Sequence, residues 1–142
     1  MKLIDVNVSR FIPGPAAEVF DVWLDPSCPG SPWHGAKKII VSPVVDGLFF
    51  WGHEHERRMM PHYGRFLRVE RGKLLEHTWM SEGTRGLEST VSISFEARPG
   101  GTQVTILHRG LPDDSGGRGH EAGWEYFLGE LEKPFHKKGK AR

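Results

Sequence analysis

Alternation of apolar and polar residues predicts β-strands along most of this chain. Residues 3–11 set the pattern, with Ile4, Val6 and Val8 on one side of a two-residue period. Further strand-like runs, separated by turn-forming residues, cover residues 37–45, 48–58, 63–71, 74–81, 87–97 and 102–110. Seven strands joined mainly by short turns indicate one antiparallel sheet.

Two segments have helical spacing instead. Residues 15–24 place Val19, Phe20 and Trp23 on one face, and Pro15 suits the first turn of a helix. Residues 25–35 are crowded with Pro, Gly and Ser, which predicts a loop or a single helical turn. The apolar stripe in residues 120–135 predicts a long amphipathic helix; it consists of Trp124, Phe127, Leu128, Leu131 and Phe135. Strands bracketed by helices indicate an α+β domain.

Composition and charge limit the classes of partner that the chain is expected to bind. A length of 142 residues, with 37% hydrophobic and 26% charged residues, predicts one globular domain. Lys and Arg number 19 against 18 Asp and Glu, which gives no strong positive field, so we expect no nucleic-acid partner. The lone Cys28 and the absence of a long apolar run predict a cytoplasmic protein with no membrane partner. Residues 136–142 are expected to form a basic, disordered tail.

Three stretches resemble a known family. The first runs from Gly64 to Trp79, the second from Ser89 to His108, and the third is Gly123-Trp124 with Leu128 and Leu131. Together they resemble the START-like (SRPBCC, birch-pollen-allergen-like) superfamily, in the branch of homologues of the activator of a heat-shock chaperone ATPase. The chain departs from the family pattern in the histidine-rich residues 51–63.

The resemblance implies a helix-grip fold over residues 1–135. In this fold a curved antiparallel sheet of about seven strands wraps around a long C-terminal helix, with two short helices between the first and second strands. The resemblance also implies a cavity between sheet and helix. Separately, the missing side chain of Gly123 is expected to permit close approach of helix and sheet.

The residue types favour a ligand pocket with aromatic walls and a few polar groups. The candidate pocket residues are Trp33, Trp51, His53, His55, Tyr63, His77, Trp79, Phe95, His108, Trp124 and Phe127. The alternative for each aromatic residue is simple core filling.

Histidines supply the candidate chemistry. His53 and His55 lie side by side on one strand face and are candidate metal ligands, but a site needs a third ligand, from His62, His77 or His108. The alternative is that they are surface or pocket-wall histidines that bind water or carboxylates. His77 and His108 are the candidate catalytic residues.

We therefore expect a small-molecule binding domain that holds a hydrophobic or aromatic ligand, rather than an enzyme, and expect no cofactor. Two alternatives stay open: a cyclase- or aromatase-like enzyme that uses pocket histidines, and a regulator of a chaperone ATPase. A homodimer is also compatible with the sequence.

Overall fold

The computed structural model describes the backbone of residues 2–140, and the side chains of all of these except 55 and 137–140. The elements are, in chain order, β1 (Leu3–Ile12), α1 (Ala16–Leu24), β2 (Lys38–Val41), β3 (Leu48–His55), β4 (Arg58–Glu70), β5 (Leu74–Ser81), the 3-10 turn η1 (Glu82–Thr84), β6 (Ser89–Arg98), β7 (Gly101–Pro112), α2 (Ser115–Arg118) and α3 (His120–Lys140).

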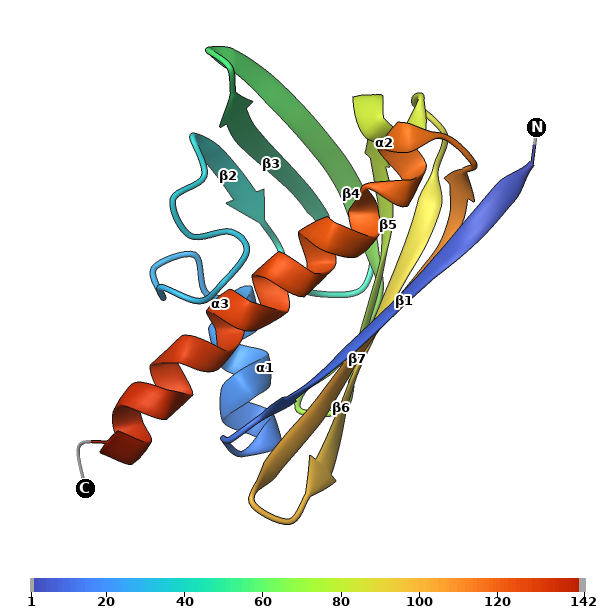
Figure 1. The fold of residues 1–142 in the computed structure, drawn as a ribbon. Coiled ribbons are helices and arrows are strands. Elements are labelled where there is room, and N and C mark those ends of the chain that lie inside the picture. The colour runs from blue at the N-terminus through green and yellow to red at the C-terminus, as the bar shows by residue number, and fades with distance from the viewer. Residues whose placement is uncertain (1, 141–142) are drawn as a thin grey trace.

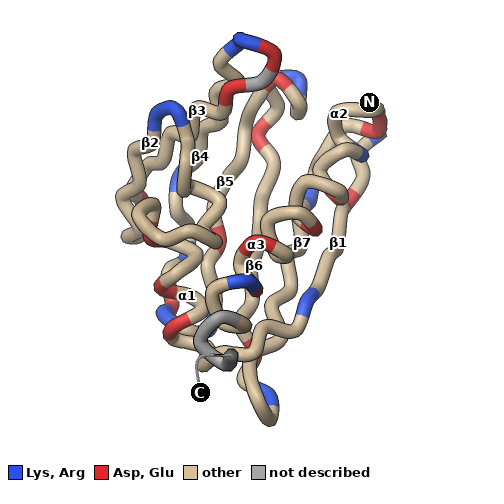
Figure 2. The backbone as a smooth tube through the Cα atoms, turned by 60° about the vertical axis from the view of Figure 1, so that its left-hand side comes forward, with Lys and Arg blue, Asp and Glu red and all other residues tan. Residues whose placement is uncertain are grey.

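The strands form one antiparallel sheet in the order β1-β7-β6-β5-β4-β3-β2. The long helix α3 crosses the concave side of this sheet, and α1 covers the same side (Figure 1). The α+β helix-grip architecture expected from the sequence is confirmed, including the seven strands. Acidic and basic residues are scattered over strands and loops, and neither sign gathers on one side of the backbone (Figure 2).

The core lies between the sheet and the two helices and includes buried apolar side chains from every strand except β2. α1 contributes Val19, Phe20 and Trp23 as its helical spacing predicts, and Phe20 contacts Phe95 of β6 edge to face at 5.1 Å. The C-terminal half of α3 adds fully or almost fully buried side chains, namely Leu128, Leu131 and Phe135.

One helix, not the expected two, lies between β1 and β2. After α1 the chain makes three successive turns in which the N–H groups of Cys28, Ser31 and His34 bond to carbonyls three residues earlier. Prolines at positions 26, 29 and 32 supply no N–H donor, so a regular helix cannot continue through this segment.

Two predicted strand boundaries were wrong. β2 ends at Val41 rather than 45, because Pro43 has no N–H for a ladder hydrogen bond. β4 begins at Arg58 rather than 63, because Glu56 and Arg57 take left-handed φ values of 50° and 64° and form a two-residue turn. This turn could not be predicted from the sequence, because the turn contains neither Gly nor Asn.

The end of the chain also differs from expectation. Between β7 and α3 the chain forms the short helix α2, whose first turn is capped by the Asp114 carboxylate on the N–H of Gly117. α3 continues through Lys140 without a break at 135, so the expected tail does not begin at a structural boundary. Residues 141–142 lie outside the described residues, and disorder of the tail stays a prediction.

Candidate functional site

The floor of the candidate site is an aromatic surface formed by three neighbouring strands. Strand register places Trp51 of β3 opposite His62 of β4, with their rings 4.6 Å apart. Trp79 of β5 lies next to both, 4.9 Å from His62 and 5.9 Å from Trp51. His53 stacks on Trp51 at 5.4 Å. The inward-facing positions of β3, β4 and β5 therefore form one continuous floor of aromatic and imidazole rings.

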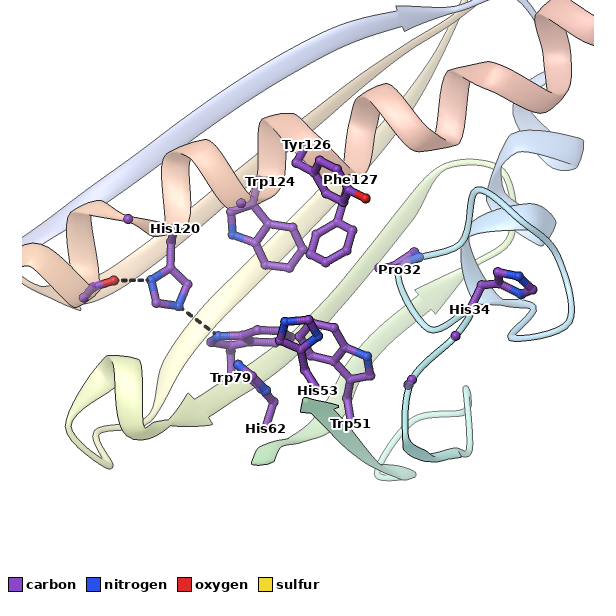
Figure 3. A pocket seen from close by; sticks show the side chains of 15 residues that line it. Pro32, His34, Trp51, His53, His62, Trp79, His120, Trp124, Tyr126 and Phe127 are labelled. Carbon is purple, nitrogen blue, oxygen red and sulfur yellow. Dashed lines mark hydrogen bonds between the residues drawn. The ribbon is translucent and has the colours of Figure 1, made fainter. Parts of the chain in front are cut away.

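The opposite wall comes from one face of α3. His120, Gly123, Trp124 and Phe127 follow the i, i+3, i+4, i+7 spacing of a helical face. Trp124 lies 5.2 Å from Trp79, and Phe127 meets Trp51 edge to face at 5.7 Å. In Figure 3 the rings of Trp124 and Phe127 lie above the indoles of Trp51 and Trp79.

A cavity of about 540 Å³ lies between this floor and this wall. The loop before β2 closes one side with Pro32, His34, Gly35 and Ala36, and the start of α3 closes another. Among the described lining residues there is no Asp, Glu, Lys or Arg, and the titratable side chains are four histidines and Tyr126. Volume, aromatic walls and a few polar groups fit the usual make-up of a small-molecule site.

Two glycines shape this region in opposite ways. A Cβ at Gly64 would stand 2.0 Å from the Phe49 ring, so the missing side chain lets that ring pack under the floor. A Cβ at Gly123 would meet no atom within 4 Å. The expectation that Gly123 serves close helix-to-sheet approach was wrong, because Gly123 lies over the cavity and its missing side chain leaves this space open.

Hydrogen bonds to imidazoles orient Trp79 of the floor and Trp124 of the wall. The Trp124 Nε1–H donates to His108 Nδ1 at 3.0 Å, so the His108 proton lies on Nε2, which donates to Ser89 Oγ at 2.7 Å. The Trp79 Nε1–H donates to His120 Nε2 at 3.2 Å, and His120 Nδ1 donates to the Gly116 carbonyl at 2.8 Å. Because an indole N–H only donates, each bond fixes the imidazole tautomer in its neutral form.

Burial keeps these histidines uncharged. The pKa of His108 is lowered to about 2, mainly by loss of solvation and to a smaller extent by the neighbouring His120 and His77. Burial also lowers the pKa of His62 and of His77 to about 4, against backbone hydrogen bonds that raise each value. Burial likewise lowers the pKa of His120. His62, His77, His108 and His120 are thus neutral near pH 7.

The structure brings some of the sequence-predicted pocket residues together and separates others. Trp51, His53, Trp79, Trp124 and Phe127 line the cavity. Trp33 is buried behind this lining, 6.2 Å from Trp51, and Phe95 lies at the distant α1 end of the core. Tyr63 is 46% exposed on the outer side of the sheet, because β4 directs His62 and Gly64 inward.

The candidate catalytic histidines are outside the cavity lining. His77 is 1% exposed among the rings of Phe49 and Phe66, with its Nδ1 2.8 Å from the Thr78 carbonyl. His108 is fully buried behind Trp124. Neither imidazole is among the lining residues, and their catalytic role stays a prediction. The lining histidines are instead His34, His53, His62 and His120.

Sequence reasoning missed His34 and His120 as pocket residues and weighed His62 only as a metal ligand. His120 could have been found, since it lies four residues before Trp124 on the predicted helix. His62 required the unexpected start of β4 at Arg58.

The metal hypothesis gains no support from the described side chains, since no group of three or more His, Cys, Asp or Glu among them could hold a metal ion. The side chain of His55 lies outside the described residues, so its pairing with His53 is not tested. No described helix is long and apolar enough to cross a membrane.

Fold and cavity together define a helix-grip domain with an aromatic pocket between sheet and C-terminal helix. Residues 13–135 match the family model described as activator of Hsp90 ATPase homolog 1-like protein, and the chain belongs to this family. No curated protein matches it.

Solved structures share the fold. The AHSA1-like protein of Aeromonas hydrophila is 22% identical, with a TM-score of 0.74 over 96% of this chain and 94% of that one. A Staphylococcus aureus protein of unknown function, SA2116, is 11% identical, with a TM-score of 0.79 over 98% and 97%. The Aha1 dimer of Colwellia psychrerythraea is 14% identical, with a TM-score of 0.70 over 93% and 96%. At these identities the likeness shows the fold alone.

Proposed function

We propose that this protein binds a small, uncharged hydrophobic or aromatic molecule in the cavity between the floor of β3, β4 and β5 and the wall of α3. The observation that carries the proposal is the cavity of about 540 Å³, lined by three tryptophans and a phenylalanine, with no Asp, Glu, Lys or Arg among its described lining residues. A charged ligand would lose its hydration there without gaining an opposite charge.

Aromatic faces recognise planar ligands by offset or edge contacts, and the neutral imidazoles of His62 and His120 supply hydrogen-bonding groups that fix orientation. Gly123 supports the proposal independently, because Gly costs an α-helix about 1 kcal/mol relative to Ala. Since no atom lies within 4 Å of the Cβ position, packing does not require a glycine there. A side chain longer than that of Ala would project from this position into the cavity, so the glycine leaves the space free for a ligand.

The test fills the cavity from Gly123. The probe is N-phenyl-1-naphthylamine, an uncharged aromatic dye that fluoresces in apolar surroundings. We expect saturable one-to-one binding to the purified protein, and a loss of affinity of at least about tenfold, equal to about 1.4 kcal/mol, in Gly123→Leu.

Gly129→Leu is the matched control, since it makes the same change on the same helix outside the lining, where the closest atom to the Cβ position is 4.0 Å away on Arg10. Circular dichroism checks that both variants fold. Equal binding by the two variants would contradict the proposal, as would no binding to the wild-type protein. Native mass spectrometry of the purified protein then looks for a molecule that co-purifies.

The family description favours a second candidate, regulation of a chaperone ATPase. Stimulation of a purified Hsp90-type ATPase by the wild-type protein would support it. If Gly123→Leu stimulates as well as wild type, regulation does not use the cavity.

We also propose that the protein is cytoplasmic, where the reducing environment would keep the single Cys28 reduced. We propose further that two copies associate through the outer face of the sheet. Ile40, Phe50, Tyr63 and Met80 are cross-strand neighbours in one apolar row over β2–β5. Ile40 is 56% and Tyr63 46% exposed, and the Colwellia relative is a dimer. Sedimentation should show a dimer for the wild type. Tyr63→Lys should dissociate this dimer, whereas Phe11→Lys, on the other edge strand, should not. A monomeric wild-type protein would contradict the proposal.

A further inference from the structure

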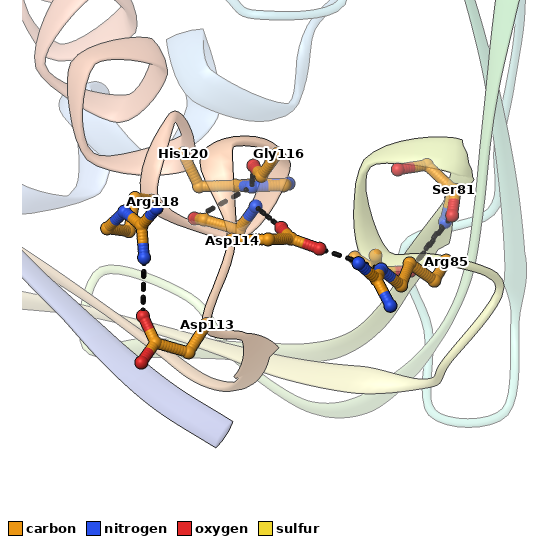
Figure 4. A network of polar contacts seen from close by, with 9 residues as sticks. Ser81, Arg85, Asp113, Asp114, Gly116, Arg118 and His120 are labelled. Carbon is orange, nitrogen blue, oxygen red and sulfur yellow. Dashed lines mark hydrogen bonds and ion pairs between the residues drawn. The ribbon is translucent and has the colours of Figure 1, made fainter. Parts of the chain in front are cut away.

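A closed ring of contacts begins and ends at Trp79. Its indole N–H donates to His120 Nε2, and His120 Nδ1 donates to the Gly116 carbonyl of α2 (Figure 3). The N-terminus of α2 is capped by Asp114, which also accepts a hydrogen bond from Arg85 Nε at 2.7 Å (Figure 4).

Arg85 closes the ring on the sheet side. It directly follows the turn η1, which Ser81 caps at the end of β5, two residues after Trp79. On the outside, the Arg85–Asp114 ion pair joins the residue after η1 to the N-cap of α2. On the inside, the Trp79–His120 hydrogen bond joins β5 to the start of α3. The outer pair is largely exposed and contributes little by itself.

His120 is the member of this ring that can change its bonding. Its Nδ1 already carries a proton, so a second proton must bind Nε2, the atom that accepts the Trp79 N–H. Two donors would then face each other, and the indole would lose its partner. His108 holds Trp124 in the same way, but it is fully buried, whereas His120 is only partly buried, at the rim of the cavity.

We infer that His120 is a positioning residue that holds Trp79 in the cavity floor, and that its protonation frees this indole, so that the site releases its ligand in acid. The predicted release of ligand in acid rests on the proposed function, whereas the predicted effect of His120 on the position of Trp79 does not.

The surroundings of His120 set its response. His108 faces it from β7 at a ring distance of 5.0 Å, and His62 of β4 is close enough to repel a second positive charge. Asp114 of α2 attracts a proton to His120, but Arg85 and Arg118 neutralise part of that carboxylate's charge. Burial outweighs the attraction, so His120 stays neutral near pH 7 and charges only in acid.

The experiment compares His120→Gln with His120→Phe. A glutamine can accept from Trp79 through Oε1 and donate to Gly116 through Nε2, but it does not titrate; a phenylalanine makes neither bond. The first readout, in ligand-free protein, is the indole N–H signal of Trp79 in ¹H–¹⁵N spectra. We expect it to move in acid in the wild type, to stay in place in His120→Gln, and to be displaced already at pH 7 in His120→Phe.

The second readout is the affinity for N-phenyl-1-naphthylamine from pH 7 downward. We expect wild-type affinity to fall by up to about tenfold per pH unit below the pKa of His120, and His120→Gln to bind with little pH dependence. His136→Gln, at the far end of α3 and outside the cavity lining, is the control that should behave as wild type.

An acid-induced loss that is the same in wild type and His120→Gln would overturn the inference, as would a Trp79 signal that does not respond to acid. If the dye binds at no pH while the Trp79 signal behaves as expected, the proposed function fails and the positioning role stands. Should His120→Phe not fold, wild type and His120→Gln alone decide the question.

Discussion

The two halves of α3 face the same sheet but do different work. The C-terminal half inserts Leu128, Leu131 and Phe135 into a closed core, and all three are at most 4% exposed. The N-terminal half presents His120, Gly123 and Phe127 to a cavity. One apolar stripe thus serves both stability and binding, and the glycine at 123 marks where close packing gives way to open space.

The largest expected effect lies in the packed half. Leu131→Ala should lower the free energy of unfolding by about 3 kcal/mol, because Leu131 is fully buried and its removal leaves a cavity in a dense core. Phe127→Ala should cost less, since Phe127 borders space that is already open. Urea denaturation of both variants measures this, and a larger loss for Phe127→Ala would break the comparison.

The second-largest expected effect is a fall in the free energy of unfolding in acid. Burial holds the pKa of His77 and His108 in the folded protein below the usual value near 6.5, so the unfolded chain binds protons that the folded one does not. Stability is therefore full above about pH 6.5 and falls as the pH drops below it. The two histidines together should lower the free energy of unfolding by about 2 kcal/mol between about pH 7 and about pH 5.5.

Denaturant titrations at several pH values check this effect. In His108→Gln the slope of stability against pH should be smaller by about one proton. An unchanged slope would show that His108 is protonated equally in both states.

The smallest effect compares the two helix glycines. Gly123→Ala and Gly129→Ala should each stabilise the protein by about 0.8 kcal/mol, because neither Cβ meets a close atom and Ala favours the helix. Thermal unfolding measures both. Destabilisation by Gly123→Ala alone would mean that the space over the cavity is filled.

The sequence predicted most of the secondary structure and less of the pocket. β5 was predicted to the residue, and the stripe of α3 follows directly from helical periodicity. Both depend only on local spacing. The pocket depends on strand register, which the unexpected Glu56-Arg57 turn sets, and this turn brings His62 beside Trp51 and turns Tyr63 outward.

The roles of His77, His108 and His120 could not be assigned from periodicity either. All three face the concave side, but only the packing of Trp79 and Trp124 decides which imidazole is sealed and which reaches the cavity. Hydrogen bonds between residues 16 and 41 positions apart leave no signal in a single sequence.

The indole N–H signals of the five tryptophans test the central claim most directly. In ¹H–¹⁵N spectra during titration with N-phenyl-1-naphthylamine, the account predicts large shifts for Trp51, Trp79 and Trp124, which line the cavity, and small ones for Trp23 and Trp33, which are buried behind it. Shifts confined to Trp23 or Trp33, or no shifts at saturating dye, would contradict a ligand site between the sheet and the N-terminal half of α3.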